Sequence, residues 1–326
     1  MKGFVSLIIF LLVSVSIFIY YRHSEYFSTG KYDIVYTWVD ENDPERQEYM
    51  KKYLKDYNED GNNRDSRYNQ NNELLYSIRS AEKNCPWLRN IYVVVKDGQV
   101  PMFLNFKNPR IKLINHSQIM PKDSLPTFNS LAIETCIHKI PGLSDMYVYM
   151  NDDIFVMKPF ELNEVSVSWK PGKDKIIKPT DLEHFYIFDL CFGYNLQLAN
   201  KLLGTNVNLT MPHVPSICYK PWEIEIENMY RKIPYKDTNM WDDTTFSKFR
   251  KNSNVALNNC VRTIYYLSKG VPINNKKDQI VLLDKNCEMK IQDVDFVCVN
   301  HIDKKCREKF NEQMNEIFPQ KSQFEN

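Results

Sequence analysis

The sequence predicts an α/β fold, in which helices flank a mainly parallel β-sheet. Two observations carry this prediction. Short runs of β-branched and aromatic residues recur along the chain, and stretches with helical spacing of apolar residues separate them. Between residues 32 and 150 the elements alternate as strand, helix, strand, strand, helix and strand. Because ligands bind beyond the carboxyl ends of parallel strands, polar residues that follow these strands are the first candidates for a functional site.

The predicted strands consist mostly of β-branched, aromatic and other apolar residues, which is typical of strands buried on both faces of a parallel sheet. In the first half of the chain they cover residues 32–39, 91–95, 111–114, 146–150 and the short run 154–157. Two more strands are expected nearer the C-terminus, at residues 280–283 and 296–299.

The first predicted helix, residues 72–84, is stopped by Cys85-Pro86, and the second, residues 128–139, ends before Pro141-Gly142. The C-terminal portion is expected to be mostly helical. Its predicted helices cover residues 185–203, 222–230, 246–250, 261–268 and a charged, exposed helical tail over 303–326.

Composition and motifs exclude several classes of function. The 42 basic residues are balanced by 41 acidic ones, so no nucleic-acid partner is indicated. The chain has no GxGxxG or GxxxxGK[ST] phosphate loop, which argues against a nicotinamide dehydrogenase or a P-loop NTPase. GxSxG and HExxH motifs are also missing. With 326 residues the chain can form one large domain or two modest ones.

The N-terminus contains an uncharged run of 18 residues, 4–21, which is close to the shortest length that spans a bilayer. No small-residue cleavage site follows it, so the run is predicted to be an uncleaved signal anchor within residues 1–22, followed by a polar stem over 23–31. This predicts a single-pass membrane protein that faces the Golgi or ER lumen if the source is eukaryotic.

The eight cysteines show neither a CxxC pair nor zinc-ligand spacing. Two N-glycosylation sequons begin at Asn115 and Asn208. An even cysteine count together with sequons favours an oxidising, lumenal compartment. The spacing does not assign any disulfide pairing.

Carboxylates follow two of the predicted strands. Asp152 and Asp153 come directly after the strand at 146–150, and Asp40 and Asp43 follow the strand at 32–39. Adjacent carboxylates at the end of a buried strand are costly unless a cation lies against them. Hard oxygen ligands of this kind suit Mg²⁺ or Mn²⁺, and a solvated turn is the alternative interpretation.

Four blocks of sequence together resemble the Stealth family. The first is DIVYTWVDENDP, residues 33–44, and the second runs over residues 67–156 and includes NNELLYSIRSAEKNCPWLRNIYVVV and LSDMYVYMNDDIF. The third begins with HVPSICYKP at His213 and reaches Arg250, and the fourth is DFVCVN, residues 295–300. The family includes bacterial capsule hexose-1-phosphate transferases and the α/β subunit precursor of N-acetylglucosamine-1-phosphotransferase. One departure is His301, which stands where the family's fourth block usually has an aspartate.

The resemblance implies a Rossmann-like, glycosyltransferase-A-like core over residues 32–160 that binds a nucleotide sugar. Residues 161–302 would complete the catalytic domain. The implied reaction transfers a sugar-1-phosphate, for example GlcNAc-1-phosphate from UDP-GlcNAc, to a hydroxyl of an acceptor glycan on a polysaccharide or glycoprotein. The nucleoside monophosphate is released, and Mg²⁺ or Mn²⁺ is the expected cofactor.

The resemblance also assigns roles to residues. Asp152 and Asp153 are the expected metal ligands. Asp40 would hold the nucleotide sugar or act as the base, and His213 would take the proton of the acceptor hydroxyl. Arg250 would stabilise charge on the transferring phosphate. The predicted catalytic residues are therefore Asp40, Asp153, His213 and Arg250.

Four further residues are candidates for substrate binding. Asp43 matches the acids of the first block, and Asn129 and Asn300 are weaker candidates for sugar contacts. Arg79 would clamp a phosphate through its guanidinium, with a salt bridge to a buried carboxylate as the alternative. Trp38 and Gln99 are expected to be structural or to line the substrate.

Two other functions remain open at the level of sequence. One is a metal-dependent glycosyltransferase that transfers the sugar alone. The other is a non-catalytic glycan-binding relative. The expected partners are a nucleotide-sugar donor, a glycan acceptor and, through the N-terminal helix, a membrane, and an oligomer is compatible with the sequence.

Overall fold

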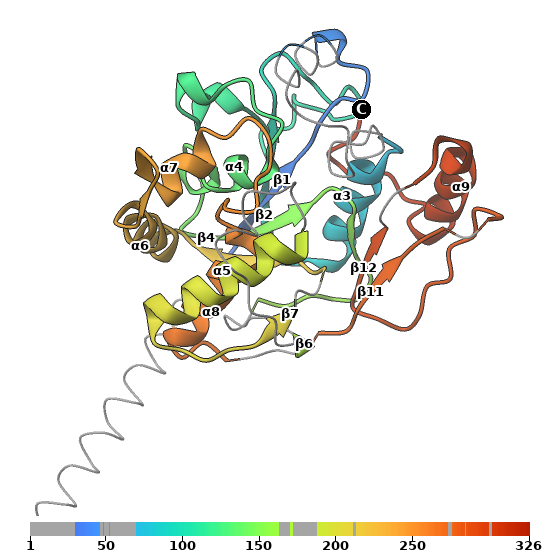
Figure 1. Cartoon of the computed structure of the whole chain (residues 1–326). Coiled ribbons are helices and arrows are strands. Elements are labelled where there is room, and N and C mark those ends of the chain that lie inside the picture. Colours follow the sequence, from blue (N-terminus) through green and yellow to red (C-terminus); the bar gives the residue numbers. More distant parts are fainter. Residues whose placement is uncertain are drawn as a thin grey trace, which may run out of the picture.

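The computed structural model, shown in Figure 1, describes residues 30–45, 48, 52, 70–162, 170–171, 188–210, 213–272, 276–283, 285–299 and 302–326. Its centre is a five-stranded sheet with the strand order β3-β2-β1-β4-β8. The strands are β1 (Tyr32–Thr37), β2 (Leu88–Val95), β3 (Ile111–Asn115), β4 (Met146–Asn151) and β8 (Ser216–Tyr219). The first four strands are parallel, as predicted, and β8 is antiparallel to β4. Strand β8 was not among the strands predicted from the sequence.

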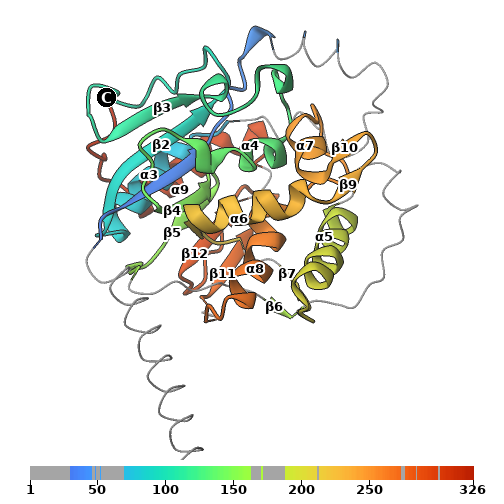
Figure 2. The ribbon, with the colours of Figure 1, turned by 90° about the vertical axis from the view of Figure 1, so that its left-hand side faces the viewer.

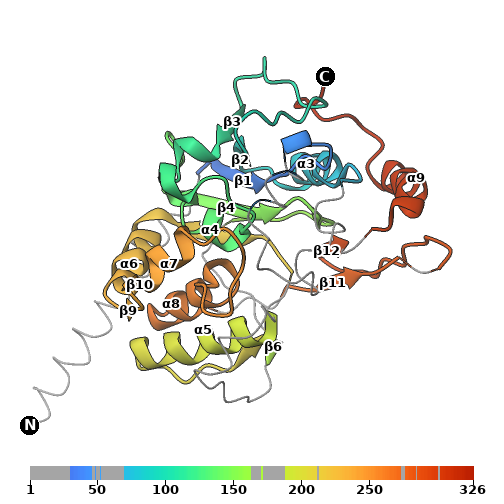
Figure 3. The same ribbon diagram turned by 45° about the horizontal axis from the view of Figure 1, so that its top comes forward.

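The alternation of side chains along β1 explains why helices cover both faces of this sheet. Ile34 and Tyr36 point to the face covered by α3 (Glu73–Asn84), whereas Val35 packs in the cluster of the opposite face. That second cluster contains residues of α4 (Ser130–Glu134) and of the 3-10 helix Ile137–Lys139. Figure 3 shows α3 on one side of the sheet and α4, α6 and α7 on the other.

The helix predicted over residues 128–139 is broken into these two short pieces. The hydroxyl of Thr135 donates a hydrogen bond back to the carbonyl of Ala132 at 2.7 Å and so competes with helical hydrogen bonding. Two 3-10 turns, His116–Gln118 and Lys122–Ser124, connect β3 to this region. The predicted helix 246–250 is wrong, because the preceding helix α7 (Met240–Thr245) ends at Phe246.

A second sheet continues from the end of β4. It has the order β11-β12-β5, with β5 (Ile154–Val156), β11 (Asp278–Val281) and β12 (Phe296–Val299). Helix α3 holds β5, because Ser77 Oγ donates to the carbonyl of Ile154 and the amide of Val156 donates to Ser80 Oγ. The turn that contains Asp152 and Asp153 therefore joins two fixed sheets.

The C-terminal half is mostly helical, as predicted. It contains α5 (Phe188–Leu203), α6 (Lys220–Arg231), α7, the π-helical turn Leu257–Val261 and α8 (Arg262–Ser268), which lie together in Figure 2. A small core that includes Cys191, Ala199, Cys260 and Ile264 joins α5 to α8. The two-residue strands form the pairs β6 (Lys170–Pro171) with β7 (Leu209–Thr210) and β9 (Pro234–Tyr235) with β10 (Thr238–Asn239).

The C-terminal tail is helical but packed, so the prediction of an exposed tail is wrong. A 3-10 turn, Lys304–Cys306, leads into α9 (Arg307–Ile317), on which Phe310 and Met314 are fully buried. These residues are four apart and form the apolar stripe of an amphipathic helix. A disulfide joins Cys287 to Cys306. The other six cysteines are buried thiols, at positions 85, 136, 191, 218, 260 and 298.

The predicted membrane anchor needs a correction. Among the residues that the structure describes, no helix is long and apolar enough to cross a membrane. The longest described helix, α5, has 16 residues, whereas a bilayer span needs about 20. The predicted span, residues 4–21, lies outside the described residues, as does most of the predicted stem. We therefore withdraw the N-terminal transmembrane helix and the single-pass membrane location that depended on it.

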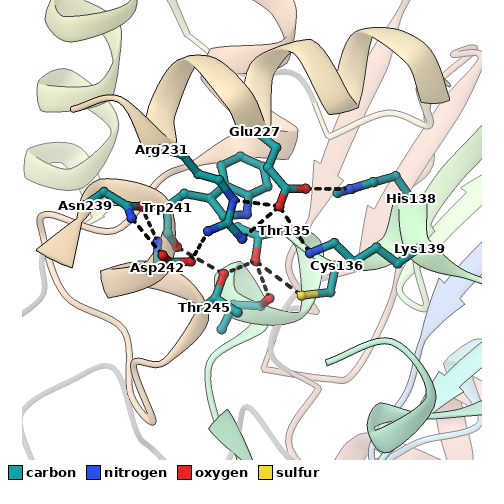
Figure 4. A network of polar contacts seen from close by, with 11 residues as sticks. Thr135, Cys136, His138, Lys139, Glu227, Arg231, Asn239, Trp241, Asp242 and Thr245 are labelled. Carbon is teal, nitrogen blue, oxygen red and sulfur yellow. Dashed lines mark hydrogen bonds and ion pairs between the residues drawn. The ribbon is translucent and has the colours of Figure 1, made fainter. Parts of the chain in front are cut away.

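One carboxylate, Glu227 of α6, links the helices on the α4 side of the sheet (Figure 4). It pairs with His138 at 2.8 Å, Lys139 at 3.3 Å and Arg231 at 2.9 Å. Arg231 in turn pairs with Asp242 of α7 at 2.6 Å. Burial opposes ionisation of Glu227, but the hydrogen bond from His138 and the neighbouring charges outweigh it and lower its pKa to about 2.

Replacement of this carboxylate by an amide, Glu227→Gln, is expected to lower the free energy of unfolding on the order of 2 kcal/mol near neutral pH. The folded-state pKa lies below the ordinary value. The contribution is therefore present above about pH 4.5 and is lost as the pH falls toward 2. Urea unfolding at neutral and acidic pH measures the difference.

The matched control is Glu225→Gln on the same helix. Glu225 pairs with Lys269, and both side chains are substantially exposed. Its loss is expected to cost less than about 1 kcal/mol. Equal losses for the two variants would contradict the role assigned to Glu227.

Candidate active site

The candidate site lies where the order of the parallel strands reverses. From β1 the chain continues on one side to β2 and β3, and then crosses to β4 on the other side of β1. In open α/β sheets ligands bind at such a switch point, beyond the carboxyl ends of the two strands. Thr37 of β1 pairs with Asn151 of β4, so the residues that follow these two positions are neighbours. The chain supplies Asp40 after β1 and Asp152 and Asp153 after β4.

Three carboxylates, Asp152, Asp153 and Glu73, influence one another electrostatically here. Burial and the neighbouring Asp153 raise the pKa of Asp152, and burial also raises the pKa of Asp153. Burial and the charge of Asp152 raise the pKa of Glu73 to about 7. Asp153 Oδ1 is enclosed and has no hydrogen-bond partner among the described residues. Like charges held together in this way favour binding of a cation.

Glu73 is a member of the site that the sequence did not single out. It stands at the first position of α3, where an acidic residue is common because it complements the helix dipole. The signal that could have revealed it is the run of Asn71, Asn72 and Glu73 before the apolar helix. Asn71 holds the carboxylate with its backbone amide at 2.5 Å and its side-chain amide at 2.8 Å.

Gln70 connects the segments after β1 and β4. Its side-chain carbonyl accepts from Trp38 Nε1 at 2.8 Å, and its side-chain amide donates to Asp152 Oδ2 at 3.2 Å. Its backbone amide donates to Glu41 at 3.2 Å. Trp38, which was expected to be structural or substrate-lining, thus orients the residue that holds Asp152.

The packed C-terminal helix also reaches this site. Arg307, at the start of α9, donates to Glu41 at 2.8 Å and to the side-chain carbonyl of Asn71 at 3.0 Å. Asn71 is the residue that holds Glu73. A segment far away in the sequence therefore fixes the loop before α3.

The two acids of the first block have different environments. Asp43 is buried and accepts from Lys96 at 2.7 Å and from Gln99 at 2.9 Å. Burial opposes ionisation, but these two partners lower the pKa of Asp43. Asp43 is therefore corrected from a substrate contact to a residue that fastens this loop to the end of β2. Asp40 is half-buried, and its carboxylate accepts only a local turn bond, from the amide of Asn42 at 2.9 Å, in the described contacts.

The antiparallel strand β8 brings His213 to the same edge. Ser216 pairs with Tyr149, so the residues before Ser216 continue past the carboxyl end of β4. The backbone amide of His213 donates to Asp278 at 3.1 Å. Both Asp278 and Asp153 act electrostatically on the buried thiol of Cys298. The register of β8 thus places His213 beyond the carboxyl end of β4.

Arg250 lies in the segment after α7 and contacts the start of α4. Its guanidinium donates to Ser130 Oγ at the start of α4. The side-chain amide of Asn129 holds this segment, donating to Asn254 at 2.9 Å and to the carbonyl of Ser247 at 3.3 Å. Asn129 also caps α4 and is completely buried. It is therefore corrected from a sugar contact to a residue that positions Arg250.

Arg79 is also corrected, because its guanidinium is fully engaged elsewhere. It forms a bidentate pair with Glu325 at 2.7 and 2.8 Å and donates to Asn315 and to the carbonyl of Phe318. The pair is buried. The salt-bridge alternative thus holds, and Arg79 anchors the C-terminus. The remaining candidate, Asn300, lies outside the described residues.

The carboxylates present fit a divalent cation in chemistry. In the described part of the chain, no three metal-binding side chains converge on one point. Mg²⁺ commonly takes only one or two carboxylates and completes its shell with water and substrate phosphates. The enclosed oxygen of Asp153 and the neighbouring Asp152 match that kind of site.

Because ionisation of Asp153 is unfavourable in the folded chain, Asp153→Asn is expected to raise the free energy of unfolding by about 1–2 kcal/mol without added metal. The pKa of Asp153 is raised on folding from 3.8 to about 6, so the gain should grow as the pH rises from about 4 to about 6 and stay constant above that. Chemical unfolding in the presence of a chelator measures it. Asp303→Asn, at a carboxylate that is 72% exposed, should change nothing. A lower free energy of unfolding in Asp153→Asn would contradict the conclusion that the charge of Asp153 destabilises the folded chain.

Removing the guanidinium in Arg79→Gln is expected to lower the free energy of unfolding by about 3 kcal/mol or more, because Glu325 stays buried without its partner. Proteolysis of the C-terminal segment should accelerate. Arg89→Gln is the comparison, since the side chain of Arg89 is 41% exposed and its partner Asp33 keeps donors from Asn90 and Ser144. A smaller loss at Arg79 than at Arg89 would reject the anchoring role.

Comparison with known proteins supports the assignment of these segments. Stealth conserved region 1 matches residues 30–58, and conserved region 2 matches residues 67–171. An exopolysaccharide phosphotransferase of Streptomyces coelicolor is 31% identical over 74% of this chain and 41% of its own length. A capsular polysaccharide phosphotransferase of Haemophilus influenzae is 43% identical over 60% of this chain and 58% of its own length. The capsular polysaccharide phosphotransferase SacB of Neisseria meningitidis is 40% identical over 44% of this chain and 26% of its own length.

The chain thus spans about a quarter to three-fifths of the length of these relatives. Among solved structures, the galactosyltransferase LgtC, in complex with donor and acceptor sugar analogues, aligns with 88% of this chain and 95% of its own. The sequence identity is 10% and the TM-score 0.37. The two conserved regions contain β1, α3, β4 and the acids of the switch point. The chain therefore carries conserved regions 1 and 2 of the Stealth family.

Proposed function

We propose that this chain is a polysaccharide phosphotransferase. It transfers a hexose-1-phosphate or N-acetylhexosamine-1-phosphate from a nucleotide-diphosphate sugar to a hydroxyl of an acceptor glycan. The observation that carries the proposal is the group of carboxylates with raised pKa at the switch point, one with an enclosed, unpartnered oxygen. The phosphotransferase names of the relatives support the class of reaction. UDP-GlcNAc is the proposed donor.

In the proposed reaction the acceptor hydroxyl oxygen attacks the β-phosphorus of the donor. A new oxygen–phosphorus bond forms, and the bond from the β-phosphorus to the bridging oxygen breaks. The nucleoside monophosphate leaves with that oxygen, and the hydroxyl proton passes to a base on the protein. Such a transfer depends mainly on in-line positioning and on stabilisation of charge.

The residues of this chain divide these tasks. His213 is proposed to accept the proton of the acceptor hydroxyl, since a neutral imidazole is suited to this near pH 7. Asp40 is proposed to orient the donor from the end of β1. Arg250, held by Ser130, is proposed to lie against the phosphate oxygens. Gln70 keeps Asp152 in place, and Asn71 keeps Glu73 in place.

Asp152 and Asp153 are proposed to hold Mg²⁺ or Mn²⁺. When bound, the cation would neutralise charge on the diphosphate. Without it, three carboxylates would repel a substrate that is itself negatively charged. Mn²⁺ is therefore expected to raise the melting temperature of the wild-type chain and to have no such effect on Asp153→Asn.

The decisive experiment uses a nucleotide sugar labelled in the β-phosphate, together with Mg²⁺ or Mn²⁺ and capsular polysaccharide acceptors. The label is expected to enter the glycan while the nucleoside monophosphate is released. Arg250→Gln and His213→Ala should each lower kcat/KM by about a hundredfold or more without changing the melting temperature.

Two other outcomes have defined meanings. Release of the nucleoside diphosphate with no label in the glycan would show transfer of the sugar alone and would replace the proposal. Glycan binding that persists in Asp153→Asn, with no turnover of any nucleotide sugar, would show a non-catalytic relative. Lys96→Gln is a control. It removes the ion pair with Asp43 that holds the loop after β1, and it should lower the melting temperature more than it lowers kcat/KM.

A further inference from the structure

Glu134, the last residue of α4, is a buried carboxylate that the proposed reaction does not use directly. The residue is 6% exposed. Its Oε2 is enclosed and has no hydrogen-bond partner among the described residues. The carboxylate receives a long contact, 3.5 Å at Oε1, from the hydroxyl of Tyr149 and a backbone hydrogen bond from Asn258. A buried carboxylate with so few donors requires a nearby positive charge.

Arg250 supplies that charge. Its guanidinium donates to Ser130 Oγ, and Ser130 lies four residues before Glu134 on α4. Residues four apart share one face of a helix, so Arg250 lies against the face that presents Glu134. Burial raises the pKa of Glu134 to about 7, and Arg250 is the charge that most strongly opposes this rise.

Arg262 is the other guanidinium near Glu134, and it already has a counter-charge. It forms a bidentate pair with Glu223 at 2.7 and 3.0 Å and donates to Asn258 at 2.7 Å. Arg262 and Glu223 are both buried. The negative charge of Glu223 matches that of Arg262. Arg250 has the larger electrostatic effect on Glu134, and Arg262 is shared with Glu223, so we assign Glu134 to Arg250.

Glu134 is also connected to the switch point. The hydroxyl of Tyr149, which contacts Glu134, lies 3.2 Å from Thr37 Oγ1. Thr37 is the last residue of β1, three positions before Asp40. Tyr149 is within the electrostatic influence of both Glu134 and Asp152. Glu134 and Arg250 thus stand beside the carboxylate cluster, on the α4 side.

We propose that Glu134 is a positioning residue that holds the Arg250 guanidinium toward the diphosphate of the donor. Glu134 is enclosed and does not touch the substrate. A carboxylate provides a fixed counter-charge behind the guanidinium, so that Arg250 is oriented before the anion arrives. An amide of the same shape lacks the charge and leaves Arg250 less constrained. The inference rests on the proposed function, because it assigns Arg250 to the phosphate groups.

The test measures binding of inorganic pyrophosphate to the full chain by calorimetry, with Mn²⁺ present. The variants are Glu134→Gln, Arg250→Gln and the double variant. Glu134→Gln is expected to weaken binding by roughly tenfold, and Arg250→Gln by at least as much. The double variant should bind no more weakly than Arg250→Gln, because Glu134 acts only through Arg250. Glu134→Asp, which retains the charge, should recover part of the affinity.

A structural role for Glu134 predicts a different pattern. The two single effects would then multiply in the double variant, or Glu134→Gln would lower the melting temperature and leave affinity unchanged. Either result overturns the inference, as does failure of the wild-type chain to bind pyrophosphate. If Glu134→Gln does not fold, Glu134→Asp replaces it in the double-mutant cycle with Arg250→Gln, and the same comparison of affinities tests the positioning role. Glu225→Gln, on the exposed face of α6, is the control and should bind normally.

The turnover assay separates the two proposals. If pyrophosphate binding follows the expected cycle but no nucleoside monophosphate is released, the positioning role stands and the reaction is wrong. If the monophosphate is released but Glu134→Gln leaves both affinity and kcat/KM unchanged, the reaction stands and the positioning role is wrong.

Discussion

The structure depends on one pairing, that of β1 with β4. These strands run parallel from Asp33 opposite Tyr147 to Thr37 opposite Asn151. They are distant in sequence, and Asp40 follows β1 whereas Asp152 and Asp153 follow β4. A shift of one residue in this register would turn the core side chains of β1 toward the wrong face, so the hydrophobic layers on both sides enforce it. The fixed register of β1 and β4 therefore sets the relative positions of the residues that follow these two strands.

The candidate site is costly for the folded chain. Asp152, Asp153 and Glu73 gather with raised pKa values, and Glu134 is buried nearby with one oxygen unpartnered. The surrounding structure tolerates this because its other buried charges are matched. The remaining helices and the C-terminus are held by the pairs Arg262 with Glu223 and Arg79 with Glu325, and by the contacts of Glu227 with His138, Lys139 and Arg231. Unmet negative charge is concentrated at the edge where an anionic substrate with its cation is proposed to bind.

Two residues that were predicted to contact substrate instead hold loops that carry other candidate residues. Asn129 and Asp43 were predicted to touch substrate, but each is enclosed and holds a loop that carries another candidate. The sequence pattern could not separate these roles, because a polar residue beside a strand or helix end looks alike whether it faces a ligand or caps its own backbone. Glu73 and Arg307 were missed for the complementary reason. An acid at a helix start and an arginine in a charged tail are ordinary surface features until the fold brings them together.

The sequence by itself determined the elements of the core and the family. Mostly apolar runs predicted four parallel strands, helical spacing predicted α3, α5 and α6, and the long blocks around Asp40 and Asp152 predicted the Stealth resemblance. Local patterns carry this information because side-chain periodicity reflects burial directly. Only the tertiary structure decided which polar groups meet. The engagement of Arg79 with Glu325, the packing of α9 and the approach of Arg250 to Glu134 involve residues more than a hundred positions apart. Their partners are selected by the folded geometry, which no local pattern encodes.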